Sequence, residues 1–322
     1  MKIGNNIGWC DATTNAVTGC DKVSPGCKNC YAEAGTRARV LRAQGHETWG
    51  VKGERVPVNF EPVFRRLNKQ CTCDYCHEAY SWRDGDLGGC SKFVPSGKVC
   101  GGTLRRIRLF ADSNSDWLDP RWPVETLARF LDAIRFAPNV NVQLLTKRIE
   151  LFKSRICEAL VWAEPVRKSD AFYAWLARWL DGKPPPNIWL GVSVEDQKRA
   201  DERVPLLLKT PAAVRFLSVE PLLEPVELFG IQPDWNWKTP LGEREVQHTS
   251  GEFGDCVVPD WIIVGGESGK NRRDCGVRSL ESIYEQCAAA GVPCYVKQDS
   301  DLMPGQRGRL SEAAWASKEF PQ

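Results

Sequence analysis

The chain of 322 residues carries 43 basic and 41 acidic side chains, and its formal charge of +2 excludes a polycationic surface over the whole molecule. A chain of this length buries a sizeable core, and we expect one domain over residues 1–322. We also expect a cytoplasmic protein with no membrane partner, because no apolar run approaches the ~20 residues that cross a bilayer and the N-terminus lacks a signal-peptide region.

Short apolar runs alternate with amphipathic stretches along the chain, which is typical of βα units and a mostly parallel sheet. Strands are expected at 7–9, 107–111, 140–146, 188–193, 214–219, 261–264 and 293–297. Helices are expected at 31–44, 124–136, 149–160, 170–180, 200–208 and 280–290, where apolar residues recur at three and four positions. The pattern therefore predicts an α/β fold.

Three cysteines, Cys20, Cys27 and Cys30, stand on one short loop between the first expected strand and helix. Three thiolates can hold three irons of a [4Fe-4S] cluster and leave the fourth iron open for chemistry. The turn-forming run 24–26 can fold the loop around such a core. On spacing alone the loop also suits zinc or ordinary thiols, since zinc commonly takes paired cysteines.

Polar residues follow the expected strands directly, where the loops of a parallel sheet converge. They include Asp112 and Ser113, Ser193 and Glu195, Thr146, Lys147 and Arg148, and Glu220 and Glu267. Glu220 and Glu267 can hydrogen-bond a nucleoside, take a substrate proton, or pair internally with Lys147, Arg148 or Lys297. Several such groups together at the strand ends predict a site, with Glu220, Glu267 and Lys147 as catalytic candidates.

A second cysteine-rich segment, 69–103, interrupts the βα pattern with a run that lacks helical or strand periodicity. Its five cysteines and His77 exceed the four ligands of a tetrahedral zinc site, and the spacing favours Cys73, Cys76, Cys90 and Cys100. The participation of Cys71 and His77 stays open, as does an auxiliary iron-sulfur cluster in place of structural zinc. With so few large apolar residues, the insertion needs a metal cross-link to order itself.

Another irregular stretch, 229–260, is expected to be an insertion or a lid over the substrate. The chain has only three histidines, none in a recognisable hydrolase setting, so a Ser-His-Asp or Cys-His nucleophile has little support.

Several phrases of the chain resemble one family, the phage and prophage three-Cys-motif proteins that are similar to radical S-adenosylmethionine (SAM) enzymes. The phrases are WCDAT (9–13), TGC (18–20), SPGCKNCYAE (24–33), LLTKR (144–148), WLGVSVE (189–195), SVEPL (218–222) and VGGESG (264–269). The six residues between Cys20 and Cys27 depart from the three of the usual radical SAM signature, and Asn29 replaces the aromatic residue that usually precedes the last cysteine.

The resemblance implies a partial (β/α) barrel of six to seven mostly parallel strands with a small metal-binding insertion. It also implies a [4Fe-4S] cluster, SAM as cosubstrate and an electron donor of the flavodoxin or ferredoxin type. By position, Asp112 and Ser113 correspond to the SAM amino-group site, and Ser193 and Glu195 are placed for its ribose and carboxylate. A phage protein of this kind would work in the host cytoplasm.

The substrate is not specified by the residues. Phage context suggests DNA or a nucleoside, and the rearrangement of an amino-acid adduct on a thymine base is one concrete form. Other nucleobases, RNA and small metabolites stay open. The alternative function is a zinc-stabilised phage DNA-binding or assembly protein in which both cysteine groups are structural.

Overall fold

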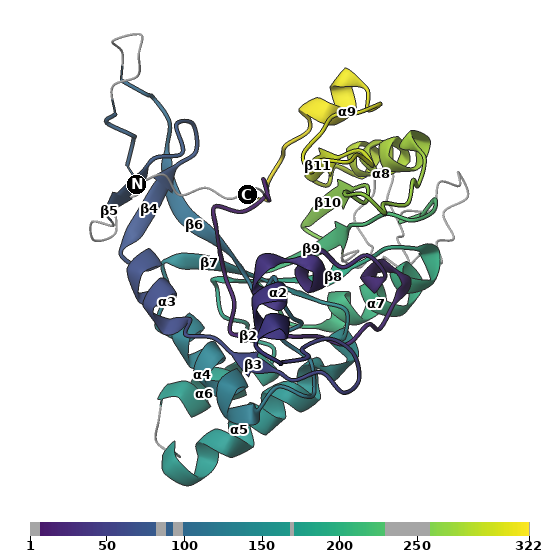
Figure 1. Cartoon of the computed structure of the whole chain (residues 1–322). Coiled ribbons are helices and arrows are strands. Elements are labelled where there is room, and N and C mark those ends of the chain that lie inside the picture. The colour runs from purple at the N-terminus through teal and green to yellow at the C-terminus, as the bar shows by residue number, and fades with distance from the viewer. Residues whose placement is uncertain (1–6, 82–87, 93–98, 168–170, 229–257, 322) are drawn as a thin grey trace, which may run out of the picture.

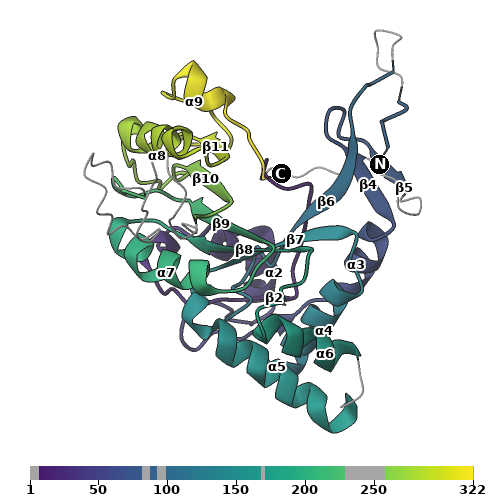
Figure 2. The same ribbon diagram turned by 180° about the vertical axis from the view of Figure 1, so that it is seen from behind.

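A computed structural model describes residues 7–81, 88–92, 99–167, 171–228 and 258–321. Most of the expected lid at 229–260 lies outside these residues. The described part contains one large sheet with helices along one side, as Figures 1 and 2 show from opposite directions.

Seven parallel strands form the main sheet, and their spatial order follows the chain. They are β1 (Ala12–Thr14), β6 (Leu104–Ala111), β7 (Val140–Thr146), β8 (Ile188–Ser193), β9 (Val214–Val219), β10 (Trp261–Gly265) and β11 (Cys294–Gln298). Within the described residues β1 pairs only with β6 and β11 only with β10, so the sheet is open rather than closed.

The cysteine-rich insertion extends this sheet at one edge. Its strand β4 (Gln70–Cys73) runs antiparallel to the first half of β6, and β5 (Ala79–Ser81) pairs with β4. The expectation of a segment without strands was therefore wrong, because these two short strands continue the backbone ladder of β6. A separate ladder joins β2 (Val17–Thr18) to β3 (Val56–Pro57).

The helices between residues 61 and 316 lie along the outer side of the curved sheet (Figure 1), whereas the two short helices after the cysteine loop pack in a separate small cluster with Trp49. Nine α-helices lie within the described residues. In chain order they are α1 (Tyr31–Ala34), α2 (Thr36–Ala43), α3 (Glu61–Leu67), α4 (Val124–Arg135), α5 (Phe152–Arg167), α6 (Ala171–Leu180), α7 (Gln197–Lys209), α8 (Val277–Ala290) and α9 (Glu312–Ala316), with 3-10 turns η1 (Pro25–Cys27) and η2 (Ile149–Leu151). None of the described helices has the length and apolar character that crossing a membrane requires.

The two faces of the sheet bury different side chains, because successive strand residues point to opposite faces. Aliphatic residues such as Leu109, Val142 and Leu190 pack under the helices. The inner face instead carries a cluster of mainly aromatic residues: Trp9, Cys10, Phe110, Trp189, Phe216, Trp261, Ile263 and Tyr295. We call this cluster the aromatic floor of the inner face.

The expected α/β fold with a mostly parallel sheet is confirmed, and the strands at 140–146, 188–193 and 214–219 have the expected bounds. The first strand was misplaced: residues 7–9 form a turn with Gly8 at φ +85, and β1 begins at Ala12. Trp9 is buried because it packs on Phe110 rather than because it belongs to a strand. The helix expected at 31–44 is interrupted at Gly35, whose backbone is extended.

Candidate functional site

The loop that carries Cys20, Cys27 and Cys30 lies across the carboxyl edge of the parallel sheet. It contacts segments that follow four of the strands. Gly19 donates its backbone N–H to Asn114 O after β6, and Arg148 after β7 reaches Cys20. Glu195 after β8 and Glu267 after β10 contact the middle of the loop. The cysteine loop therefore lies at the edge of the sheet where the sequence predicted polar residues.

Cys20 lies beside a buried cation. Arg148 Nη1 and Nη2 stand 3.8 and 4.0 Å from Cys20 Sγ, and the side chain of Arg148 is held by Asp116 at 2.9 Å. Burial raises the pKa of the Cys20 thiol to about 12, Asp116 adds to that rise, and Arg148 opposes it. A thiolate at this position thus depends on a positive neighbour, which a metal or the guanidinium can supply.

Cys27 and Cys30 are partly exposed on the same loop. Ser24 Oγ lies 3.7 Å from Cys27 Sγ, while Cys20 and Cys30 both pack against the small buried cluster of Ala32, Ala38 and Trp49. Unlike the four cysteines of the insertion, the sulfurs of Cys20, Cys27 and Cys30 do not all lie within 4.8 Å of one another. The three ligands of a cluster bind different irons, so they do not need the close mutual approach of the ligands of a single ion.

Tyr31 directly follows Cys30 and stands over the inner side of the sheet. Its hydroxyl donates to Ser113 O at 3.0 Å, and 65% of the residue is exposed. Yet burial raises the pKa of the phenol, with further contributions from Cys30, Glu220 and Cys10. Through this hydrogen bond Tyr31 links the cysteine loop to the segment that follows β6.

Glu195 supports the cysteine loop from beneath. It is fully buried, its Oε2 accepts from Arg203 Nη1 at 2.8 Å, and a Cβ added at Gly26 would stand 3.3 Å from its carboxyl group. Although desolvation opposes it, Lys147 and Arg203 lower the pKa of Glu195 and keep it ionised. Lys147 therefore acts on Glu195 through its charge.

Glu267 holds the loop from the other side. Its carboxylate receives Asn29 Nδ2 at 2.9 Å and the Arg273 guanidinium at 2.7 Å, and Arg273 Nη1 also donates to Pro25 O at 2.9 Å. These donors lower the pKa of Glu267 against the effect of desolvation. Asn29 thus helps to anchor the loop.

Asp112 is buried beneath the site, with its oxygens accepting from Ala16 N, Val17 N and Ser115 Oγ. Burial raises the pKa of this carboxyl to about 7 despite those hydrogen bonds. Ser113 Oγ donates to Asn15 at 3.2 Å. The side chains of Asp112 and Ser113 therefore join the segments that follow the paired strands β1 and β6, and Ser113 O accepts from Tyr31.

Glu220 and Lys297 form an ion pair on the inner face, across Gly265 of β10. An added Cβ at Gly265 would lie 3.4 Å from Glu220 Oε1 and from Lys297 Cβ, so the missing side chain gives the pair room. Ser193 lies at the end of the neighbouring β8 and is buried. The small residues Gly265 and Ser193 therefore lie near the same ends of the strands as the Glu220–Lys297 ion pair.

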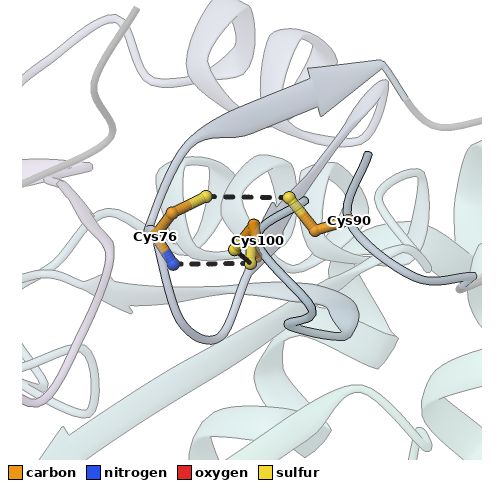
Figure 3. Close-up of side chains that lie close together, drawn as sticks. Cys76, Cys90 and Cys100 are labelled. Carbon is orange, nitrogen blue, oxygen red and sulfur yellow. Dashed lines mark hydrogen bonds between the residues drawn. The ribbon is translucent and has the colours of Figure 1, made fainter. Parts of the chain in front are cut away.

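A second cluster, in the insertion, brings together the four cysteines that the spacing favoured. The sulfurs of Cys73, Cys76, Cys90 and Cys100 lie within 4.8 Å of one another. Cys73 and Cys100 Sγ are 3.6 Å apart, and Cys76 and Cys90 Sγ are 3.7 Å apart, with Cys76 and Cys90 turned toward each other in Figure 3. Tetrahedral zinc with bonds of ~2.3 Å separates its sulfurs by roughly 3.8 Å, so this group could bind zinc.

The backbone around the four sulfurs is also suited to thiolates. Tyr75 N and Cys76 N each donate to Cys73 Sγ at 3.4 Å, and a Cβ at Gly102 would stand only 2.5 Å from that sulfur. Cys71 lies outside the group, with its thiol directed at Tyr80 O, and His77 is not part of it either. Among the described residues, the group that could hold a metal ion therefore consists of four cysteines.

Sequence reasoning did not identify Tyr31, Asn29 and Arg273 as members of the site, nor the contact of Arg148 with Cys20. Tyr31 and Asn29 stood within the cysteine phrase, and Arg148 and Arg273 stood in short polar runs after strands. Position next to the motif was the available signal, but the pairing of Arg273 with Glu267 could only come from the fold.

The family profile described as "Protein of unknown function (DUF5131)" matches residues 4–317, and the chain belongs to that family. Neither the curated proteins nor the solved structures contain a match to the chain.

Proposed function

We propose that this member of the family is a radical SAM enzyme. The observation that carries the proposal is the position of the three-cysteine loop over the carboxyl edge of seven parallel strands. Working residues of parallel α/β barrels collect at this edge. We further infer that the open sheet is a partial (β/α) barrel, since its strands follow one another in chain order and its helices lie on the outer side.

In this proposal the three thiols would hold a [4Fe-4S] cluster with one iron left for SAM. Cys20, Cys27 and Cys30 come from one loop, and each is partly exposed. When bound, such a cluster supplies one electron that splits the sulfonium bond of SAM into methionine and a 5'-deoxyadenosyl radical. The protein's task is to hold the reactants and exclude competing routes.

Residues around the loop perform that task in distinct ways. Glu267 with Arg273 and Glu195 with Arg203 fix the loop over the sheet. Tyr31, and the ion pair of Glu220 with Lys297, would meet the nucleoside of SAM and the substrate. Asp112, Ser113 and Ser193, at the ends of β6 and β8, would line the SAM site. The four-cysteine insertion would hold structural zinc, away from the chemistry.

The substrate of the proposed reaction is a modified thymine base in phage DNA or its nucleoside, rearranged by the radical. A reduced flavodoxin or ferredoxin would deliver the electron. Comparison of the nucleosides of phage DNA made with and without the gene tests this choice.

Anaerobic reconstitution tests the radical SAM proposal directly. We expect a brown protein that converts SAM to 5'-deoxyadenosine with dithionite, and a Cys20→Ala, Cys27→Ala, Cys30→Ala variant that retains zinc but loses the brown cluster and the activity. Cys157→Ala, which alters a partly buried cysteine on α5, is the matched control and should behave like the wild type. A colourless protein with zinc alone would instead favour the DNA-binding or assembly function.

A further inference from the structure

Arg148 is the cation nearest to a cysteine of the loop among the described contacts. Its Nη1 and Nη2 lie 3.8 and 4.0 Å from Cys20 Sγ, although 128 residues separate the two in the chain. Arg148 is only 5% exposed. Charges act more strongly at such a place than in water, because little solvent screens them.

The guanidinium of Arg148 is fixed in this position. Nη1 pairs with Asp116 Oδ2 at 2.9 Å, and Nη2 lies 3.9 Å from Asp119 Oδ2. Asp116 is itself held, since its Oδ1 accepts from Thr146 Oγ1 at 2.7 Å and its Oδ2 from Lys147 N at 2.9 Å. Arg148 is therefore held beside Cys20 Sγ, and Asp116 is held against the guanidinium of Arg148.

We propose that Arg148 and Asp116 set the reduction potential of the cluster that Cys20 helps to hold, an inference that rests on the proposed function. Reduction adds one electron from an external low-potential donor and so makes the cluster one charge more negative. A cation beside a ligand sulfur stabilises that added charge, whereas a carboxylate disfavours it. Arg148 raises the potential and Asp116 lowers it.

The opposite signs provide the test. We expect the midpoint potential of reconstituted Arg148→Gln to be more negative than that of the wild type, because the cation is lost and Asp116 is left uncompensated. Arg148→Lys keeps the charge and should stay near the wild type. Asp116→Asn should shift the potential in the positive direction. The potentials are measured by titration with dithionite and redox mediators, followed by electron paramagnetic resonance.

Arg155→Gln is the matched control, because Arg155 is equally buried but bonds to Trp122 O and Glu158 rather than to the loop. It should reduce stability without moving the potential. Equal potentials in all variants, or shifts of the same sign in Arg148→Gln and Asp116→Asn, would overturn the inference. If Arg148→Gln does not retain the cluster, Asp116→Asn decides, and an unshifted potential there overturns it. If the wild-type protein binds no cluster, the proposed function itself is wrong, and the inference about the potential falls with it.

Discussion

Asn29 and Glu267, 238 residues apart in the chain, are joined by a hydrogen bond of 2.9 Å that ties the cysteine loop to the segment after β10. Glu267 is 6% exposed and also receives three donors from Arg273. Since Arg273 in turn donates to Pro25 O, this carboxylate holds the loop at Pro25, before Cys27, and at Asn29, before Cys30.

Glu267→Gln should therefore loosen the cysteine loop. The amide keeps the size of the side chain but weakens charge-assisted hydrogen bonds, and we expect a loss of about 1–3 kcal/mol in the free energy of unfolding. Iron should pass faster to an external chelator, which absorbance of the iron-chelator complex measures. Glu61→Gln, at a more exposed pair with Arg129, should change stability by less than about 0.5 kcal/mol. Equal rates of iron loss in wild type and Glu267→Gln would contradict this role.

The four-cysteine cluster should bind one zinc ion per chain. Cys76→Ser and Cys100→Ser each remove one ligand and should lower the zinc content measured by mass spectrometry of the metal. Cys71→Ser should not, since the Cys71 thiol lies outside the group. Because structural zinc contributes its binding free energy to folding, the insertion should become sensitive to proteases when zinc is lost. Simultaneous loss of zinc and iron in Cys76→Ser would show that the two sites are not independent.

The elements that the sequence predicted well are those whose pattern is local. The strand at 140–146 is a nearly continuous buried run, and the four cysteines of the insertion follow a ribbon-like spacing. β1 was missed because Ala12–Thr14 is short and carries little apolar signal, while Trp9 nearby suggested a strand that does not form. Short elements gain their order from the neighbour they pair with, here β6.

The interactions that hold the candidate site were mostly beyond sequence reasoning. The polar strand ends were visible, but their partners were not, because each contact joins segments far apart in the chain. Arg148 meets Cys20, and Glu195 meets the backbone at Gly26, only after the sheet has placed the ends of β7 and β8 beneath the loop. Asp112 illustrates the same point, since its sequence position suggested a ligand contact and its carboxylate also secures backbone N–H groups of Ala16 and Val17.

Gly191 on β8 should not tolerate a side chain. A Cβ there would stand 2.4 Å from the ring of Phe216, which belongs to the aromatic floor of the inner face. Gly191→Ala should cost about 1–3 kcal/mol of unfolding free energy through overpacking, as measured by urea denaturation. Gly89→Ala, where an added Cβ meets nothing within 4 Å, is the comparison. A loss at Gly89 as large as at Gly191 would argue against the packing explanation.

Asp112→Asn should stabilise the protein in a pH-dependent way. Burial raises the pKa of Asp112 from 3.8 to about 7, so the folded state binds a proton that the unfolded state releases between these values. The wild type therefore loses stability as the pH rises from about 4 to 7, by at most ~4 kcal/mol, and the penalty then stays constant. Asparagine remains neutral, can still accept from Ala16 N and Val17 N, and tolerates the φ of +73 at this position.

The free energy of unfolding of Asp112→Asn should thus exceed that of the wild type only slightly near pH 4 and most at pH 7 and above. Urea denaturation at pH 4.5 and pH 8 would measure the difference. Asp301→Asn, at a partly exposed carboxylate on the β11–α9 loop, is the control. A constant difference between Asp112→Asn and wild type over this pH range would mean that Asp112 is ionised at low cost in the folded protein. Its hydrogen bonds from Ser115 and the two backbone N–H groups would then outweigh the desolvation of the carboxylate.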